Sequence, residues 1–513
     1  MAVSGSRILP PGMDETTFIE ALDAIAAIIG KENVSYTSIG GALEGPHGQR
    51  HYGDVYEMRD KDSHTPSGAV RPSMVEEVQA VLRVANKYKL PLWTVSRGKN
   101  LGYGGSAPVV RGTVVLDLHR MNKLIEVNHE YAYAVVEPGV SFFDLFEYID
   151  KNDYNLWPSV PALGWGSVLG NVLERGFGYT PNGEHSQQQC GMEIVLSNGE
   201  IVRTGMWAKK DCTMGPLFKG GYGPGIDSLF YQSNLGVVTK LVFQRKLDLG
   251  ILNGTLSRLQ RESVIMNHPT ISNLFRQMAV SENPAILQQV LAPGSQGGHA
   301  SRELLDRLNL TKERGFWKGI VQDAFEGVPG VKFGADYHEA KRGQRLKIRD
   351  MPEFEIPHNG FPRLSALPMM DTRGYGGGHI CFSPLFPPGG KELYEWYKFA
   401  SQRISEENFD LFADFHCYGR YTIAIVVMVY GPTEGRRADA LYEELMVQAH
   451  EEHQTSEYRT HIDYMSKIAS HFDFNDGALN KFVTGLKELL DPNGILSQGK
   501  SGIWSTRHDK VDE

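Results

Sequence analysis

The sequence predicts an α+β protein in which helices and short strands are mixed rather than segregated. Three observations carry this prediction. Helix-like and strand-like periodicity alternate over the first 245 or so residues, a strong hairpin turn lies at 197–199, and the pattern changes after residue 247. The 513-residue length favours two to four domains.

The first predicted helix begins after Asp14, a good N-cap residue, and ends at Gly30. Its apolar face repeats at helical spacing through Phe18, Leu22, Ile25 and Ile29. A second helix is expected to open with a capping box between Ser73 and Glu76 and to end before Pro91, with Val78, Val81, Leu82 and Ala85 facing inward.

Strands are predicted at 92–95, 114–118 and 131–136, and Ser141 is expected to cap a helix that runs through Tyr148. Residues 193–196 and 200–202 flank Ser197-Asn198-Gly199, a strong hairpin turn. Residues 247–454 read as a second domain, with helices at 302–308 and 438–451 and a strand at 421–430.

Composition narrows the class of protein. The formal charge of −9 argues against a nucleic-acid groove or an anionic membrane surface as the main partner. No run of about 18 apolar residues predicts a membrane span, and no secretory signal is evident. The four cysteines form no CxxC pair, which favours reduced thiols over a zinc site. We therefore expect a cytoplasmic enzyme with no metal, no nucleic acid and no membrane partner.

Two glycine-rich segments, 96–105 and 164–171, stand out. Glycines allow backbone N–H groups to approach a pyrophosphate, and Arg97 or Lys99 would lie near its charge. Neither segment is GxGxxG, so a Rossmann site is not supported. Tight turns remain the alternative for each segment alone, although two of them favour a dinucleotide held in extended form.

Residues 494–501 match GxxxxGK[ST], the pattern of a phosphate-binding P-loop. A helix rather than a buried strand is predicted before the match, and only 12 residues follow Ser501. We reject the ATPase interpretation on this context.

Other candidate polar residues are weak when taken alone. A lone His379 between a glycine-rich turn and a strand is usually structural, Tyr458-Arg459 could form a surface ion pair, and His450 with His453 has no third metal ligand in view.

Together these segments resemble the vanillyl-alcohol oxidase / p-cresol methylhydroxylase flavoproteins, also called 4-phenol oxidizing enzymes. The resemblance covers nearly the whole chain. It is carried by residues 98–105, 166–171, 174–181, 378–379, 457–461 and 491–495. It implies a two-domain FAD-binding fold of the p-cresol methylhydroxylase type with an α/β cap domain. Residues 1–246 and 455–513 would form the FAD-binding domain, and residues 247–454 the cap.

The resemblance also implies the roles of individual residues. Tyr103, Tyr458 and Arg459 match the trio that binds the phenolic oxygen as phenolate. His379 matches the residue that links covalently to the flavin, with Tyr375 a weaker alternative. Substrate contacts are expected from Cys381, Glu457 and Ile425. The expected FAD contacts are Arg97, Gly98, Lys99, Asn100, Leu101, Gly102, Gly166, Ser167, Gly170, Asn171, Tyr179 and Lys500.

The sequence departs from the family at one important position. Where the vanillyl-alcohol oxidase branch has an Asp beside the flavin, this chain has Ala162. Asp414 stands where that branch has Thr and the p-cresol methylhydroxylase branch has Glu. We expect Asp414 to be the base that activates water, from the opposite wall. We expect His416 to point to the other face of its strand, and we assign it no role.

The resemblance implies oxidation of para-substituted phenols through a p-quinone methide, which is then hydrated to an alcohol or loses a proton to give an alkene. We expect O₂ as acceptor, H₂O₂ as product and a homodimer or larger homo-oligomer. A cytochrome c subunit is the less favoured acceptor. A non-catalytic flavin-binding protein is the third alternative, but it would not need Tyr103, Tyr458 and Arg459.

Overall fold

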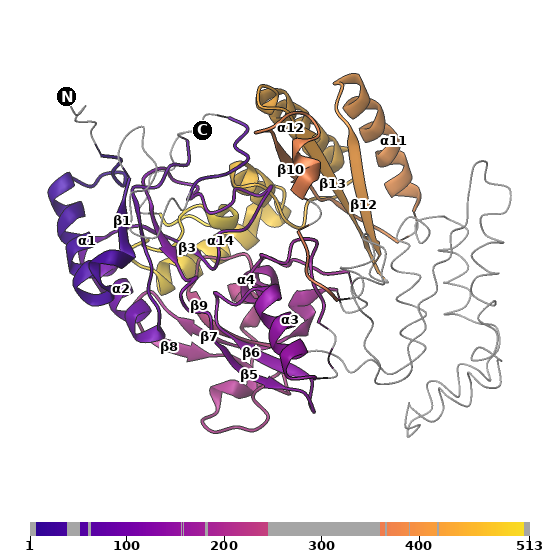
Figure 1. Ribbon diagram of the computed structural model, residues 1–513. Coiled ribbons are helices and arrows are strands. Elements are labelled where there is room, and N and C mark those ends of the chain that lie inside the picture. Colours follow the sequence, from indigo (N-terminus) through magenta and orange to yellow (C-terminus); the bar gives the residue numbers. More distant parts are fainter. Residues whose placement is uncertain are drawn as a thin grey trace, which may run out of the picture.

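The computed structural model describes residues 7–37, 52–59, 63–154, 156, 158–179, 183–244, 360–364, 367–388, 390–417 and 420–506. The helix expected at 302–308 and the boundary at 246/247 lie outside these residues. Within them, three sheets and their helices are arranged as Figure 1 shows.

The first sheet has the order β1-β2-β4-β3 and carries helices α1 and α2. β1 is antiparallel to β2, whereas β2, β4 and β3 are parallel. Leucine, valine and alanine side chains of these elements form one buried core. The elements are α1 (Glu15–Ile29), η1 (Lys31–Asn33), β1 (Val34–Tyr36), β2 (Gly68–Val70), α2 (Val75–Tyr88), β3 (Leu92–Val95) and β4 (Val114–Asp117).

The ends of α1 are as predicted: the Asp14 carboxylate accepts from Thr17 N–H, and Gly30 is the C-cap. The capping box predicted for α2 is wrong by one residue. Glu77, not Glu76, accepts from Ser73 N–H at 2.7 Å, and Met74 is the N-cap. The helix begins one residue later than expected, and its buried residues Val78, Val81, Leu82 and Ala85 are those predicted to face inward.

The second sheet is antiparallel, with the order β5-β6-β9-β7-β8. The predicted hairpin at 197–199 joins β7 to β8, and the predicted Ser141 cap forms a capping box with Asp144. The elements are β5 (Leu124–Asn128), β6 (Tyr133–Val136), α3 (Phe142–Lys151), α4 (Val168–Leu173), η2 (His185–Gln188), β7 (Gln189–Val195), β8 (Ile201–Arg203), η3 (Gly205–Ala208), η4 (Asp227–Phe230) and β9 (Val237–Gln244).

The third sheet is built on β13, which pairs antiparallel with β10, β11 and β12. The even-numbered residues of β13 pack in a hydrophobic core with α11 and α12. Because side chains alternate along a strand, the odd-numbered residues of β13 face away from these helices. The elements are η8 (Leu367–Asp371), β10 (Gly378–Phe382), β11 (Leu385–Phe386), α11 (Lys391–Glu406), β12 (Leu411–Cys417), β13 (Thr422–Tyr430) and α12 (Gly435–Glu451).

The last segment returns to the N-terminal half of the chain. It contains η9 (Ile462–Tyr464), α13 (Met465–Ser470), α14 (Phe474–Leu490) and η10 (Lys500–Gly502). Leu496 bridges to Leu92 of β3. The fully buried Lys487 ammonium pairs with Asp491 at 2.7 Å and donates to the Leu496 and Asn234 carbonyls. The P-loop-like residues thus follow a helix and lie beside β3, which agrees with rejecting the ATPase interpretation.

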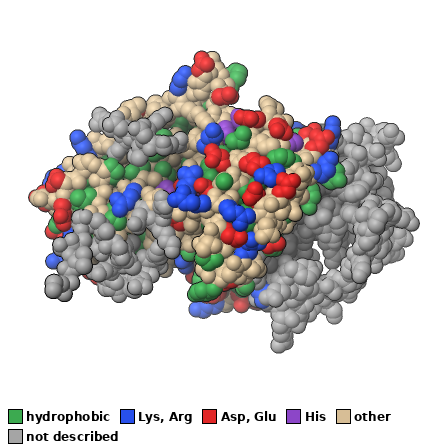
Figure 2. Space-filling model, turned by 90° about the horizontal axis from the view of Figure 1, so that it is seen from above, with side chains coloured by type: hydrophobic (Ala, Val, Ile, Leu, Met, Phe, Trp, Pro, Cys, Tyr) green, Lys and Arg blue, Asp and Glu red, His purple; other side chains and the backbone are tan. Residues whose placement is uncertain are grey.

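The surface carries charges of both signs. Figure 2 shows Lys and Arg side chains interspersed with Asp and Glu on the face seen from above. Arg403 of α11 pairs with Glu444 of α12 at 2.6 Å, and Arg373 pairs with Glu434 at 2.7 Å. Among the helices in the described ranges, none has the length and apolar character needed to cross a bilayer.

Candidate active site

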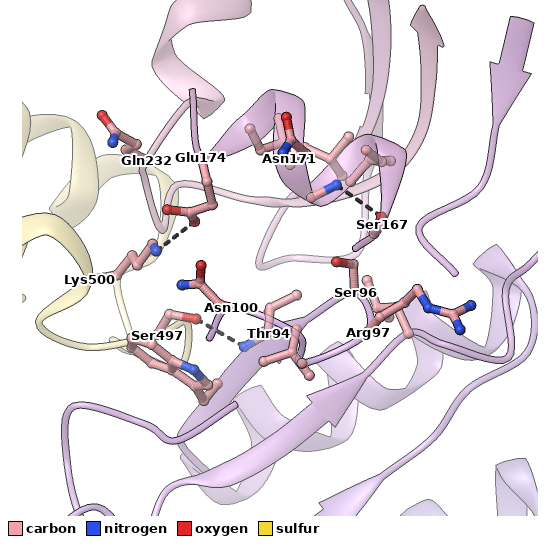
Figure 3. Close-up of a pocket in the computed structure, with 18 of the residues that line it drawn as sticks. Thr94, Ser96, Arg97, Asn100, Ser167, Asn171, Glu174, Gln232, Ser497 and Lys500 are labelled. Carbon is pink, nitrogen blue, oxygen red and sulfur yellow. Dashed lines mark hydrogen bonds and ion pairs between the residues drawn. The ribbon is translucent and has the colours of Figure 1, made fainter. Parts of the chain in front are cut away.

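A cavity opens where the two glycine-rich segments meet (Figure 3). Residues 230–238 and the C-terminal return complete its wall. Nine residues expected to contact the cofactor line it: Arg97, Gly98, Lys99, Asn100, Gly166, Ser167, Gly170, Asn171 and Lys500. Leu101, Gly102, Tyr179 and His379 are not part of this lining. The interpretation of the segments as unrelated tight turns is therefore wrong, because both contribute to one cavity.

The backbone of the first segment is a compact turn beneath the cavity. Tyr103 N–H and Gly105 N–H both donate to the Asn100 carbonyl, at 3.1 and 3.0 Å. Gly102 has φ +77°, and a Cβ there would lie 2.5 Å from Nε2 of His379. Only glycine combines this conformation with this close approach. The turn thus brings its backbone against the histidine of the third sheet.

An ion pair between a lysine and a glutamate lies in the cavity wall. Lys500 Nζ lies 2.6 Å from Glu174 Oε1, and Figure 3 shows the two side chains pointing toward each other. Burial raises the pKa of Glu174, but the charges of Lys500 and Arg459 outweigh it and lower the pKa overall. Glu174 is therefore a carboxylate at neutral pH. Glu174 was not predicted as a site residue from the sequence, although it begins the block 174–181 that resembles the family.

The two cations of the first segment are held in different ways. Arg97 donates from Nη1 to the Gly139 carbonyl at 2.6 Å, and its buried Nε has no hydrogen-bond partner among the described residues. The Lys99 ammonium lies 5.3 Å from the centre of the Trp165 ring. Both positive charges belong to the cavity wall, as expected of a site for a phosphorylated ligand.

One face of the third sheet carries the remaining predicted site residues. His379 and Cys381 alternate along β10 with the core residues Ile380 and Phe382. Asp414 pairs in register with Ile425 of β13. Because directly opposed residues share a face, these side chains lie on the side away from α11 and α12.

His379 is buried at 6% exposure, and burial lowers its pKa to about 4. The imidazole is therefore neutral at pH 7, and its Nδ1 has no hydrogen-bond partner in the described part of the chain. Tyr375, the alternative attachment residue, is 93% exposed. The structure does not bring Tyr375 to the cavity, because the glycines around it form a surface turn.

Tyr103, Tyr458 and Arg459 meet although they are far apart in sequence. The Tyr103 hydroxyl lies 3.3 Å from Ser383 Oγ, and Arg459 Cζ lies 4.1 Å from the centre of the Tyr103 ring. Arg459 also donates to the Asn100 side chain. The interpretation of Tyr458-Arg459 as a surface pair is therefore wrong.

The charges in this trio favour an anion. Burial raises the pKa of Tyr458 to about 12, against the opposing effects of Arg459 and the Tyr103 hydroxyl. Burial disfavours the charged Arg459, but Tyr103, Tyr458 and Glu174 outweigh it and raise its pKa. Two neutral phenols and one permanent cation therefore converge, an arrangement suited to bind a phenolate oxygen.

Glu457 lies behind the trio. Its carboxylate accepts from the Tyr442 hydroxyl at 2.5 Å and from Ser383 N–H at 3.1 Å. Burial raises its pKa to about 8. Because both oxygens bond to interior groups, Glu457 orients the Tyr458-Arg459 segment, and the structure does not show it facing the cavity as a substrate contact. Ser383 was missed by the sequence analysis, since a serine after a strand carries no distinguishing signal.

Asp414 and His416 are on the same face of β12, so the expectation that they point in opposite directions is wrong. In a strand residues two apart share a face. His416 Nε2 lies 2.7 Å from Asp414 Oδ2. The Tyr179 hydroxyl lies beside the same carboxylate, whose charge adds to burial in raising the pKa of Tyr179. Tyr179, expected to contact the cofactor, lies at this wall, near Cys381 and Tyr458.

His450 and His453 each contact another side chain of the third sheet's helix or the segment after it. The His450 ring stacks on that of His471 with 3.8 Å between centroids, and His453 contacts the Gln448 amide. Among the described residues, no group of three His, Cys, Asp or Glu side chains could hold a metal ion.

Comparison with known proteins defines the class first. Residues 66–205, which include both glycine-rich segments, match the family described as "FAD binding domain". The residues present fit FAD: Gly166 lines the cavity with open space where a Cβ would stand, the Leu163 carbonyl oxygen at 3.6 Å being the nearest atom, and the buried Arg97 Nε lacks a partner within the described ranges. The class is therefore an FAD-binding protein.

Longer matches define the family. The chain is 30% identical over 539 aligned residues to the 4-cresol dehydrogenase (hydroxylating) flavoprotein subunit of Pseudomonas putida, covering 98% of this chain and 99% of the relative. The solved 4-ethylphenol oxidase of Gulosibacter chungangensis, in complex with isoeugenol, superposes with a TM-score of 0.75 at 29% identity, covering 97% of this chain and 99% of that one.

Substrate-bound p-cresol methylhydroxylase superposes with a TM-score of 0.74 at 27% identity, covering 98% of this chain and all of that one (100%). The chain belongs to the vanillyl-alcohol oxidase / p-cresol methylhydroxylase family of flavoproteins and has the FAD-binding fold of p-cresol methylhydroxylase.

Proposed function

We propose that this protein oxidises para-substituted phenols at the carbon attached to the ring, with 4-alkylphenols such as 4-ethylphenol and 4-propylguaiacol as preferred substrates. Eugenol and vanillyl alcohol are further candidates. The observation that carries the proposal is the convergence of Tyr103, Tyr458 and Arg459 beside the cavity that both glycine-rich segments line.

The trio supplies the first requirement of this chemistry. A free phenol has a pKa of about 10 and is mostly neutral at pH 7. The Arg459 charge and the two hydroxyl donors favour the phenolate. The negative charge on the ring then favours loss of hydride from the benzylic carbon, which leaves a p-quinone methide. FAD supplies the hydride acceptor at its N5 atom.

His379 is the proposed attachment residue for the flavin. Its neutral imidazole carries the lone pair that a covalent bond requires, and its Nε2 faces Gly102 beneath the cavity. Acid precipitation tests this step directly. The wild-type precipitate should stay yellow, and His379→Ala should release its FAD into the supernatant; release from the wild type would contradict the assignment.

Asp414 is the proposed base for hydration. Its carboxylate is partly exposed at 39%, on the wall that Tyr179 connects to Cys381 and Tyr458. Ala162 provides no alternative acid. Water would then add from the side opposite to that in the vanillyl-alcohol oxidase branch and give mainly the S alcohol from 4-ethylphenol. Mostly R alcohol on chiral chromatography would overturn this assignment.

Two electron acceptors are possible for the reduced flavin in this family, O₂ and a cytochrome c. We propose O₂, with H₂O₂ as product, in a cytoplasmic homodimer or larger homo-oligomer. The alternative is a cytochrome c-linked dehydrogenase. It is favoured by the full-length likeness to a dehydrogenase flavoprotein subunit, whereas the likeness to an oxidase of similar coverage favours O₂.

One experiment tests the function and separates the acceptors. Purified protein is mixed with 4-ethylphenol, first without O₂ and then in air, while the flavin spectrum and H₂O₂ are followed. Anaerobic bleaching with prompt peroxide in air supports the oxidase. Bleaching with slow reoxidation, accelerated by cytochrome c, supports the dehydrogenase. A flavin that does not bleach overturns the proposed substrate class.

A further inference from the structure

The Asp414 carboxylate has two fixed neighbours that the resemblance did not supply. His416 approaches it from two residues further along β12, with 2.7 Å between Nε2 and Oδ2. Tyr179 approaches from the N-terminal half of the chain, through its hydroxyl. We infer that His416 and Tyr179 are positioning residues that keep the Asp414 carboxylate aimed at the substrate, and thereby direct the quinone methide to hydration. This inference rests on the proposed function.

The His416 ring is itself fixed by aromatic packing. Its centroid lies 4.2 Å from that of Phe177 and 5.3 Å from that of Tyr179. Phe177 in turn lies 6.1 Å from the Tyr458 ring. The imidazole therefore packs between the Asp414 carboxylate and the aromatic ring of Phe177, which leads to the phenol-binding Tyr458. An ordinary surface ion pair has no such support and is free to rotate.

The side chains of His416 and Asp414 differ in their exposure to solvent. The His416 side chain is 10% exposed, and the Asp414 side chain is 39% exposed. The imidazole is covered, whereas the carboxylate retains open surface. This is the arrangement expected when the carboxylate meets the reactant and the histidine acts through it.

Both neighbours act as donors toward the carboxylate. A carboxylate only accepts hydrogen bonds, so the imidazole donates from Nε2 and the phenol donates its hydroxyl proton. Hydrogen bonds to the charged form of an acid favour ionisation, which is the state that a base needs. They also restrict the carboxylate to one orientation, and orientation alone can change a rate by orders of magnitude.

This arrangement assists the addition of water to the quinone methide. The oxygen of water forms a bond with the benzylic carbon of the quinone methide, and one O–H bond of the water breaks. The proton goes to the Asp414 carboxylate. The electron pair of the exocyclic double bond passes into the ring, which becomes aromatic, and restores the phenolate that Arg459 binds. No further oxidant or reductant is needed.

The experiment compares His416→Gln, Tyr179→Phe, Asp414→Asn and the double variant His416→Gln/Asp414→Asn in the flavin-containing protein, with His453→Gln as control. Two quantities are measured with 4-ethylphenol. The first is the anaerobic rate of flavin reduction, which reports hydride loss. The second is the ratio of alcohol to 4-vinylphenol, together with the enantiomeric excess of the alcohol.

We expect the rate of flavin reduction to fall less than the alcohol-to-alkene ratio in His416→Gln and Tyr179→Phe, because neither residue binds the phenolic oxygen. The alcohol-to-alkene ratio should fall on the order of tenfold in His416→Gln, and less in Tyr179→Phe. The double variant should match Asp414→Asn, because His416 acts only through Asp414. His453→Gln should match the wild type.

Unchanged product ratio and enantiomeric excess in both His416→Gln and Tyr179→Phe would overturn the inference. So would additive effects in the double variant, or a wild type that forms mainly 4-vinylphenol. If His416→Gln does not fold, Tyr179→Phe, which removes one hydroxyl, decides the question alone. Absence of flavin bleaching in the wild type is a different result, because it contradicts the proposed function itself.

Discussion

The guanidinium of Arg459 lies over the ring of Tyr103, with 4.1 Å between Cζ and the ring centroid. Tyr103 comes from the turn beneath the flavin cavity, and Arg459 comes from the segment that follows α12. The contact thus joins the cofactor side and the substrate side of the site. It also fixes the plane of the cation, because guanidinium groups prefer to lie flat on aromatic faces.

Replacing Arg459 by Lys should show how much this plane matters. Arg459→Lys keeps a positive charge but loses the stacking and the hydrogen bond to Asn100. We expect kcat/KM for 4-ethylphenol to fall about 10- to 150-fold, the range for loss of a hydrogen bond to a charged group. Arg403→Lys, an equivalent change on α11, should leave kcat/KM unchanged. Equal kcat/KM values for Arg459→Lys and the wild type would show that Arg459 does not bind the phenolic oxygen.

Gly102 provides a test of the close approach between the turn and His379. In Gly102→Ala the new Cβ would lie 2.5 Å from His379 Nε2. Gly12→Ala is the matched control, because Gly12 also has positive φ but has no atom within 4 Å of a Cβ. Both variants should lose about 1–2 kcal/mol of unfolding free energy from left-handed strain. Only Gly102→Ala should bind less FAD, measured as flavin absorbance per protein.

The buried Glu457 should make stability depend on pH in an unusual direction. Its pKa is about 8 in the folded chain against an ordinary value of 4.5, so the folded state holds the proton more tightly. Stability from this group is present below about pH 4.5 and decreases as pH rises toward 8. Between pH 5.5 and 8 the wild type should lose on the order of 3 kcal/mol that Glu457→Gln does not lose.

Urea unfolding of both proteins at the two pH values measures this difference. Glu434→Gln is the control, since the pKa of Glu434 is lowered to about 2 and does not titrate in this range. Parallel pH dependence in Glu457→Gln and the wild type would show that Glu457 is ionised throughout.

His461 connects the N-terminal loop to the C-terminal return. Its ring pairs with Asp54 at 2.9 Å and with Asp463 at 3.2 Å. Burial opposes protonation, but the two carboxylates raise its pKa to about 9. The stabilisation is complete below about pH 6.5 and is lost as pH rises through 9. At pH 6 His461→Gln should cost about 3–5 kcal/mol, because it removes the charged partner of the buried Asp54 carboxylate.

The control is Arg437→Gln, which removes the exposed ion pair with Glu434 and should cost under about 1 kcal/mol. Urea midpoints at pH 6 and pH 10 provide the measurement. The defect of His461→Gln should shrink at pH 10, where the wild-type imidazole is also neutral. A defect of the same size at both pH values would mean that packing, not charge, explains it.

Cys381 should determine the length of alkyl chain that the site accepts. Its side chain is buried at 7% and lies near Tyr103 and Tyr179. Cys381→Phe should lower kcat/KM for 4-propylphenol relative to 4-methylphenol by about 10-fold or more, because overpacking costs roughly 1–3 kcal/mol. Cys381→Ala, which adds space, should not. A constant ratio in both variants would place the alkyl chain elsewhere.

Local chemistry made much of the fold predictable. The Asp14 cap, the Ser141 capping box and the hairpin at 197–199 depend on side chains within a few residues of the feature, so they were predicted correctly. The predicted capping partner of Ser73 was wrong. Glu76 and Glu77 are chemically identical, and only the residue at which the helix begins decides which of them reaches Ser73.

The sequence by itself determined which residue types are present for the site: glycines for close backbone approach, one arginine beside a tyrosine, and a histidine ahead of a strand. Only the tertiary structure decided how they meet. It put both glycine-rich segments in one cavity, Tyr375 in solvent, Glu457 behind the trio, and His416 and Tyr179 against Asp414. The reason is physical: strand pairing and burial determine which face each side chain occupies, and these contacts join residues that are distant in sequence.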